Sequence, residues 1–173
     1  HSIVQKLNEE QVADTAASDE EAVLENKIAE YDAFLTKQDP AFTVEELEEA
    51  MQKVMDQYAG GIGTHYQFNE KQLGMAEEKI KKLQILAKGL AAADMHELMF
   101  IYELKERLTV CLTVIAHLLA RKETRWHSFA ENLDYPEKSD AWLCYVNSKK
   151  NGDQITMIRR DLVKGGETYE HRD

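Results

Sequence analysis

The sequence predicts a mainly α domain: an antiparallel bundle of about four helices followed by a small C-terminal β-hairpin. Four segments carry apolar residues at the spacing of one helix face, and each is preceded by a residue pair typical of a helix start. The composition then becomes strand-like on either side of an Asn-Gly pair. With 173 residues, of which 43% are hydrophobic, the chain is long enough to bury a core.

The first helix is expected to begin at Ser18, after an acidic, alanine-rich lead-in over residues 1–17. Ser18 with Glu21 three positions on forms a capping-box pattern, and Asp39-Pro40 is expected to stop the helix. One apolar stripe follows the cap at helical spacing: Leu24, Ile28, Tyr31 and Leu35.

The second and third helices have the same kind of start. Thr43 with Glu46 predicts the second, which Gly60 is expected to end as a left-handed C-cap glycine, and Asn69 with Gln72 predicts the third. The second stripe is Val44, Leu47, Met51, Val54, Met55 and Tyr58; the third is Leu73, Ala76, Ile80, Leu83, Ala87 and Leu90.

The fourth helix starts at Asp94 with Glu97, and its second half is apolar on nearly every face. A helix of this kind must be covered by other elements, so we expect it to be the central helix of the bundle. The residues concerned are Leu108, Val110, Cys111, Leu112, Val114, Ile115, Leu118 and Leu119.

The pattern changes after Pro136. Two stretches rich in aromatic and β-branched residues flank Asn151-Gly152, a dipeptide favoured in tight hairpin turns. The predicted division is therefore a lead-in over 1–17, a bundle over 18–140, a hairpin packed on the bundle over 141–163, and a loose tail over 164–173.

Charge and composition narrow the possible partners. The whole net charge of −11 lies in residues 1–50, which hold 14 acidic against 3 basic residues, and an acidic face of this kind disfavours nucleic acid as a partner. No apolar run approaches the roughly 20 residues that span a bilayer, so membrane insertion is not expected. Cys111 and Cys144 match no metal or redox spacing and suit free thiols in a cytoplasmic protein.

No catalytic residue and no metal site is predicted. Gly60, Gly61 and Gly63 follow a helix, lack the spacing of a dinucleotide-binding turn and have no Walker lysine. His96-Glu97 is not completed to H-E-x-x-H, because Phe100 stands at the last position.

The candidate site is the charged and aromatic cluster that follows the fourth helix. Cations near the last carbonyls of a helix are favourable, which explains Arg121 and Lys122 but not the further guanidinium beside an indole. Guanidinium groups next to aromatic rings are typical of interfaces and anion sites. The candidate interface or anion-binding residues are Arg121, Glu123, Arg125, Trp126, Asp134 and Tyr135.

The same cluster carries a family resemblance. The stretch over 120–151 reads ARKETRWHSFAENLDYPEKSDAWLCYVNSKKN. It resembles the C-terminal region of the α (flavoprotein) subunit of adenylylsulfate reductase, in the wider fumarate reductase and succinate dehydrogenase flavoprotein group. Residues 55–73 and 93–110 resemble the same subunit, so the likeness covers roughly residues 45–150. Asn132 departs from it, because the family has arginine there.

This resemblance implies a helical domain that rests against an FAD-binding domain of the same subunit, which pairs with an iron–sulfur β subunit. It also implies the reduction of adenylylsulfate to AMP and sulfite, with FAD in the full-length subunit. The FAD fold needs a G-x-G-x-x-G turn that this chain lacks, so no cofactor is expected in the chain itself. The chain therefore resembles one domain of an oxidoreductase and is not expected to be catalytic alone.

Two alternatives stay open. One is a domain of a fumarate reductase or succinate dehydrogenase-type flavoprotein subunit. The other is a free-standing helical interaction module with no catalytic role.

Overall fold

The computed structural model describes residues 17–152 and 154–162, and within them the chain is mainly helical. The mainly α prediction with a C-terminal hairpin is confirmed. The helices are α2 (Ala17–Leu35), α3 (Val44–Tyr58), α4 (Glu70–Ala87) and α5 (Met95–Ala120), and the hairpin strands are β3 (Cys144–Asn151) and β4 (Gln154–Asp161). The predicted lead-in up to residue 16 and the predicted tail over 164–173 lie outside the described residues.

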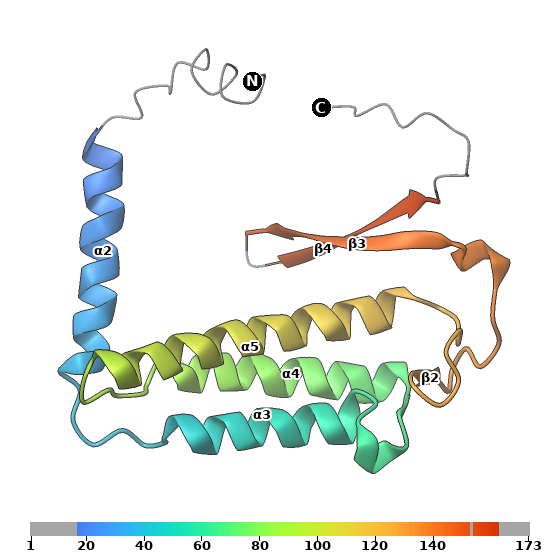
Figure 1. Cartoon of the computed structure of the whole chain (residues 1–173), viewed down its shortest axis with the longest axis horizontal. Helices are drawn as coiled ribbons and strands as arrows, with labels where there is room; N and C mark the ends of the chain where they lie inside the picture. Colours follow the sequence, from blue (N-terminus) through green and yellow to red (C-terminus); the bar gives the residue numbers. More distant parts are fainter. Residues whose placement is uncertain (1–16, 153, 163–173) are drawn as a thin grey trace.

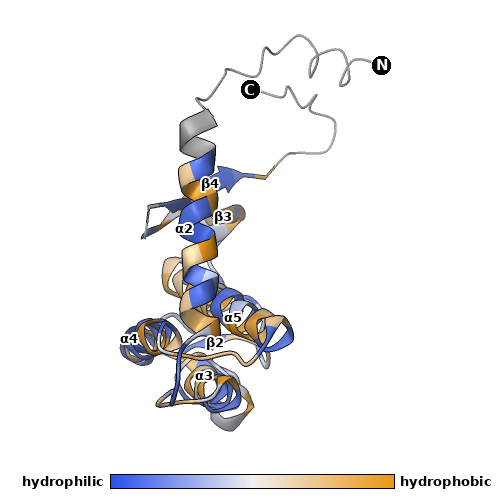
Figure 2. Ribbon diagram, turned by 90° about the vertical axis from the view of Figure 1, so that its left-hand side faces the viewer, coloured by the Kyte–Doolittle hydropathy of each residue, from blue (hydrophilic) through white to orange (hydrophobic). Residues whose placement is uncertain are grey.

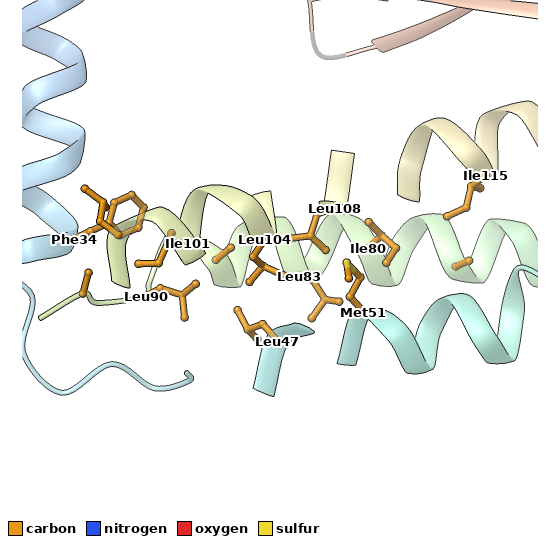
Figure 3. Packing of buried hydrophobic residues seen from close by; sticks show 14 of the residues in the cluster. Phe34, Leu47, Met51, Ile80, Leu83, Leu90, Ile101, Leu104, Leu108 and Ile115 are labelled. Carbon is orange, nitrogen blue, oxygen red and sulfur yellow. The ribbon is translucent and has the colours of Figure 1, made fainter. Parts of the chain in front are cut away.

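Three of the helices, α3, α4 and α5, pack side by side, with α4 antiparallel to both α3 and α5 (Figure 1). Figure 2 shows these helices nearly end-on, and buried apolar residues from all three form one core. Figure 3 shows side chains of this core, with Leu47 and Met51 from α3, Ile80 and Leu83 from α4, and a row from α5. Every member of the predicted third stripe is buried: Leu73, Ala76, Ile80, Leu83, Ala87 and Leu90.

Three of the four predicted caps are present, because each residue pair acts locally. Thr43 accepts from the Glu46 amide while the Glu46 carboxylate accepts from the Thr43 amide, which is a complete capping box. Asn69 and Asp94 accept from backbone amides in the first turns of α4 and α5. Gly60 has the left-handed φ of 79° expected for the glycine after α3.

The remaining helix, α2, stands at a steep angle to the other three, and the lower end of α2 touches α5 (Figures 1 and 2). Phe34 is buried there, and Tyr31 meets the Tyr102 ring edge-on at 5.3 Å. Further up, Leu24 and Ile28 of the predicted stripe are exposed. Ser18 lies within the described helix, so the prediction that it is the N-cap is wrong.

Helix α5 is central, as predicted, because it contacts the other three helices and both hairpin strands. Leu108 and Ile115 are buried as expected. The prediction that all its faces are covered is wrong: Val110 is 60% exposed and Val114 is also exposed. These two valines lie on the side that no described element covers.

The hairpin lies along α5, with its turn directed toward α2 (Figure 1). Its strands alternate, so that Val146, Ile155 and Met157 are half-buried while Tyr145 and Ile158 are exposed. Asn151 pairs with Gln154, so the two connecting residues are 152 and 153, one place later than the predicted Asn151-Gly152 pair. Gly152 supplies the positive φ of 60° that the turn needs.

In the described part of the chain, no helix is both long enough and apolar enough to cross a membrane.

Candidate functional site

The candidate residues lie where α5 ends and the chain folds back over the neighbouring end of α4. Arg121 has an extended conformation and is the C-cap of α5. Ten residues later β2 (Glu131–Asn132) pairs in parallel with β1 (Gln67–Phe68), just before α4 begins. This pairing fixes the returning loop to the start of α4, and we call residues 121–143 the return segment.

Glu123 is the centre of the return segment, and its side chain has no exposed surface. Arg125 donates from Nε and Nη2 to the two carboxylate oxygens, each at 2.9 Å, in a bidentate pair. Arg121 donates to the same carboxylate at 2.5 Å, and the Ser139 amide donates at 3.0 Å. The buried carboxylate of Glu123 therefore binds two guanidinium groups and the backbone amide of Ser139, in the later part of the return segment.

Both arginines also bind backbone carbonyls. Arg121 donates to the carbonyls of Trp142 at 3.0 Å and Cys144 at 3.1 Å, which fixes the first residue of β3 to the end of α5. Arg125 donates to the Ser139 carbonyl at 3.3 Å. The structure thus gives both arginines an internal, positioning role.

This network keeps Glu123 ionised. Burial raises the pKa of Glu123, but hydrogen bonds from Arg125, the Ser139 amide and Arg121 outweigh burial and lower the pKa from 4.5 to about 2. Pairing with Glu123 in turn raises the pKa of Arg125.

Acid is therefore expected to weaken the fold through Glu123. Because its pKa is lower in the folded than in the unfolded chain, its contribution is complete above the unfolded value and is lost as the pH falls toward the folded value. After discounting for the partly exposed arginines, we expect a loss of about 1–2 kcal/mol between pH 5 and pH 2.

Urea unfolding of the wild type and Glu123→Gln across this pH range measures that loss. Glu30, whose pKa is also lowered to about 2, gives both proteins a common acid dependence, so their difference isolates Glu123. Parallel pH profiles for the two proteins would contradict the assignment.

Thr124 and Asn132 complete the interior of the return segment, and sequence reasoning assigned neither to the site. The Thr124 hydroxyl lies 3.0 Å from the Tyr135 carbonyl and accepts from the Asn132 amide at 2.9 Å. The Asn132 side chain accepts from the Asp134 amide at 3.1 Å. Both residues are buried, so hydrogen bonding within the loop explains their polar character.

Asp134 and Tyr135 connect the segment to α4. The Asp134 carboxylate accepts from the Glu70 amide at 2.7 Å, at the positive end of α4, where an anion is favourable. Lys122 pairs with Glu70 and lies 5.3 Å from the centre of the Tyr135 ring. Here too the candidates position backbone, because they join the ends of α4 and α5.

Trp126 is the candidate that the structure leaves outside the network. It begins a tight turn in which it pairs with Ala130, and its side chain is 69% exposed. Phe129, in the same turn, is 75% exposed. Three further apolar side chains in or just after the return segment are also exposed: Leu133, Leu143 and Tyr145. We call Trp126 and Phe129 the aromatic turn.

The glycine loop does not have the geometry of a flavin-phosphate site. Residues 61–64 fold over the last turn of α3, and the Gly63 amide donates to Asp56 at 2.9 Å. A side chain on Gly61 would place its Cβ 2.3 Å from the Asp56 Cα. The described residues form two two-stranded sheets, and none of these strands leads through a glycine turn into a helix as in a dinucleotide-binding fold.

Comparison with known proteins supports the resemblance. The family model described as "Fumarate reductase flavoprotein C-term" matches residues 48–167, more than half of the chain. The fold and the return segment therefore belong to a class of helical domain found in flavoproteins, and the chain belongs to this family.

Within that group the chain is similar to adenylylsulfate reductases. It is 34% identical over 98 residues to the adenylylsulfate reductase subunit alpha of Megalodesulfovibrio gigas, covering 56% of this chain and 15% of that protein. It matches the adenylylsulfate reductase structure from Archaeoglobus fulgidus with a TM-score of 0.78 and 32% identity, over 87% of this chain and 26% of that one.

Two further structures match. An adenosine-5-phosphosulfate reductase in complex with sulfite gives a TM-score of 0.71 and 34% identity, over 82% of this chain and 24% of that one. E. coli quinol fumarate reductase FrdA gives the same TM-score at 17% identity, over 92% of this chain and 28% of that one, and this likeness shows the fold alone. The chain thus spans between 15% and 28% of the length of these relatives.

Proposed function

We propose that this chain is the C-terminal helical domain of an FAD-dependent oxidoreductase subunit of the adenylylsulfate reductase type, and that it docks through its aromatic turn. The docking partner is the FAD-binding domain of the same subunit, and an iron–sulfur subunit completes the electron path. The parent enzyme reduces adenylylsulfate to AMP and sulfite, with FAD held outside this chain.

The aromatic turn is the observation that carries the proposal. Trp126 and Phe129 are more than two-thirds exposed, whereas Arg121, Glu123 and Arg125 just before them form a closed network. Exposed aromatic side chains on a rigid base lose little conformational freedom on binding, which makes them effective anchors. The network therefore serves docking indirectly, since it fixes the backbone that presents the turn.

The sequence identities favour a parent enzyme of the adenylylsulfate reductase type over one of the fumarate reductase type. The chain shares 32–34% identity with the adenylylsulfate reductases but 17% with the fumarate reductase of similar fold. A fumarate reductase-type parent is the second candidate, because the family model carries that description.

The parent activity is tested on the polypeptide encoded by the complete reading frame around His1. Purified with its partner subunit, it should be yellow and should oxidise a reduced dye with adenylylsulfate but not with fumarate. Fumarate-dependent oxidation would support the second candidate. A frame without a flavin-bearing part would contradict both and leave the free-standing interaction module.

Docking is tested with Trp126→Ala and a matched control. The exposed Trp126 is expected to leave the unfolding free energy of this chain nearly unchanged, within about 0.5 kcal/mol. Binding to a separately produced flavin-bearing part should weaken by about 2 kcal/mol, or about 30-fold, measured by titration calorimetry. Phe42→Ala removes an exposed aromatic ring from the loop between α2 and α3 and should bind like the wild type. Equal losses in both variants would contradict docking through the aromatic turn.

A further inference from the structure

A second surface lies away from the return segment, in a cleft of about 780 Å³ bordered by α2, α4, α5 and the turn end of the hairpin. Figure 1 shows the hairpin directed over α5 toward α2, and residues of all these elements line the cleft. The volume lies within the roughly 300–1,000 Å³ usual for small-molecule sites. None of the candidate residues of the return segment lines it.

The cleft has an apolar floor. Phe34 of α2, Leu112 of α5 and Ile155 of β4 lie along it, and Ile85 of α4 adds a side chain that is largely exposed. Leu112 and Ile155 also line an adjoining cavity of about 320 Å³, together with Ala116 and Leu119. The two spaces therefore share walls, and apolar surface continues from the cleft along α5 beneath β4.

The rim of the cleft is basic. Five lysines line it, from α4 and its C-cap, from α5 and from β3: Lys81, Lys88, Lys105, Lys149 and Lys150. Lys81 pairs with Glu77, and Lys105 pairs with Glu30, the one acidic residue among the described residues that line the cleft.

Glu30 does not neutralise the positive charge of the other lysines on the rim. Hydrogen bonds from Lys105 and Lys27 lower the pKa of Glu30 to about 2, so its charge is already balanced by these two lysines. Lys88, Lys149 and Lys150 make no ion pair with any residue in the described ranges. In a chain of net charge −11, the cleft thus concentrates cations next to apolar surface.

We propose that this cleft binds an amphiphilic organic anion, whose charged head lies among Lys88, Lys149 and Lys150 and whose apolar body lies on Leu112 and Ile155. Lysine ammonium groups attract a carboxylate, sulfonate or phosphate head as point charges, without demanding one head geometry. The apolar floor adds affinity in proportion to the buried body, which distinguishes such a ligand from a simple inorganic anion. The inference is independent of the docking proposed above.

Sodium decanoate is the probe, titrated into the intact chain by calorimetry below its micellar concentration. We expect one site, with affinity falling roughly tenfold from decanoate to octanoate because two CH₂ groups are removed. Sodium sulfate, an anion without an apolar chain, and decyltrimethylammonium, an apolar chain with a cationic head, should not bind measurably. Equal binding of decanoate and decyltrimethylammonium would overturn the proposal.

Two triple variants separate the cleft from general electrostatics. Lys88→Gln with Lys149→Gln and Lys150→Gln should weaken decanoate binding at least tenfold. Lys53→Gln with Lys71→Gln and Lys138→Gln removes three exposed charges outside the cleft and should change it less than about twofold. All six lysines are exposed, so both variants should keep the wild-type unfolding midpoint.

Ile85→Ser tests the floor at an exposed position and should reduce the gain per CH₂. Equal losses in the two triple variants would overturn the site. Binding of oligoglutamate as tight as that of decanoate would overturn the amphiphile and favour an acidic protein segment instead.

Discussion

Replacing Glu123 with alanine is expected to lower the free energy of unfolding by about 3–4 kcal/mol, the largest effect of any single substitution proposed for this chain. The carboxylate is buried and accepts hydrogen bonds from Arg121, Arg125 and the Ser139 amide. Without it, two partly buried guanidinium groups face each other with no counter-charge, and a backbone donor loses its acceptor. The unfolding midpoint in urea, at neutral pH, measures the loss.

The control for Glu123→Ala is Glu49→Ala. Glu49 forms an exposed ion pair with Lys53 on the surface of α3, and such pairs contribute little. Its removal should leave the midpoint nearly unchanged. Similar shifts for Glu123→Ala and Glu49→Ala would mean that the Glu123 network does not hold the return segment.

The consequence for docking follows from the same contacts. Glu123→Ala should also weaken binding to the flavin-bearing part, because the aromatic turn begins only one residue after Arg125. Trp126→Ala should weaken binding without loss of stability. This difference separates a residue that positions the surface from one that forms it.

Local chemistry made much of the fold predictable. The starts of α3, α4 and α5 follow from Thr43, Asn69 and Asp94, because a cap acts on amides within one turn of itself. The stripe of α4 is buried in full because it faces two helices at once. At the helix starts and along the α4 stripe, the residues that form the sequence pattern are also the residues that make the contacts.

The direction of α2 and the open side of α5 could not be predicted in the same way. Periodicity indicates which face of a helix is apolar, but it does not identify what covers that face. Leu24 and Ile28 on α2, and Val110 and Val114 on α5, are apolar and yet exposed. Exposed apolar faces of this kind are expected in a domain that packs against a further part of a protein.

The sequence predicted where the candidate site lies in the chain, but not which of its residues bind one another and which stay exposed. The cluster of arginine and tryptophan stood out because helix-end chemistry did not explain Arg125. Which of these residues would be satisfied internally depends on contacts with Ser139, Trp142 and Cys144, which are distant in sequence. Those contacts leave Trp126 69% exposed.

Gly61→Ala is expected to destabilise the chain by about 3 kcal/mol, because the added Cβ has no room. It would lie 2.3 Å from the Cα of Asp56, which is backbone of α3 and cannot move without bending the helix. The loop over residues 61–64 also leads into β1, which pairs with β2 of the return segment. Displacing this loop should therefore loosen the return segment as well as the end of α3, which thermal unfolding and hydrogen exchange at residues 131–132 would detect.

Alanine substitutions at two other glycines are expected to have smaller or opposite effects on stability. At Gly63 the added Cβ would meet the end of the flexible Asp56 side chain at 2.4 Å, so Gly63→Ala should cost less than Gly61→Ala. At Gly74, inside α4, no atom lies within 4 Å, so Gly74→Ala should stabilise the chain by about 0.5–1 kcal/mol through helix propensity. The order Gly74, Gly63, Gly61, from gain to largest loss, follows from what each added methyl group meets. A Gly61→Ala protein as stable as the wild type would show that the loop does not lie against Asp56.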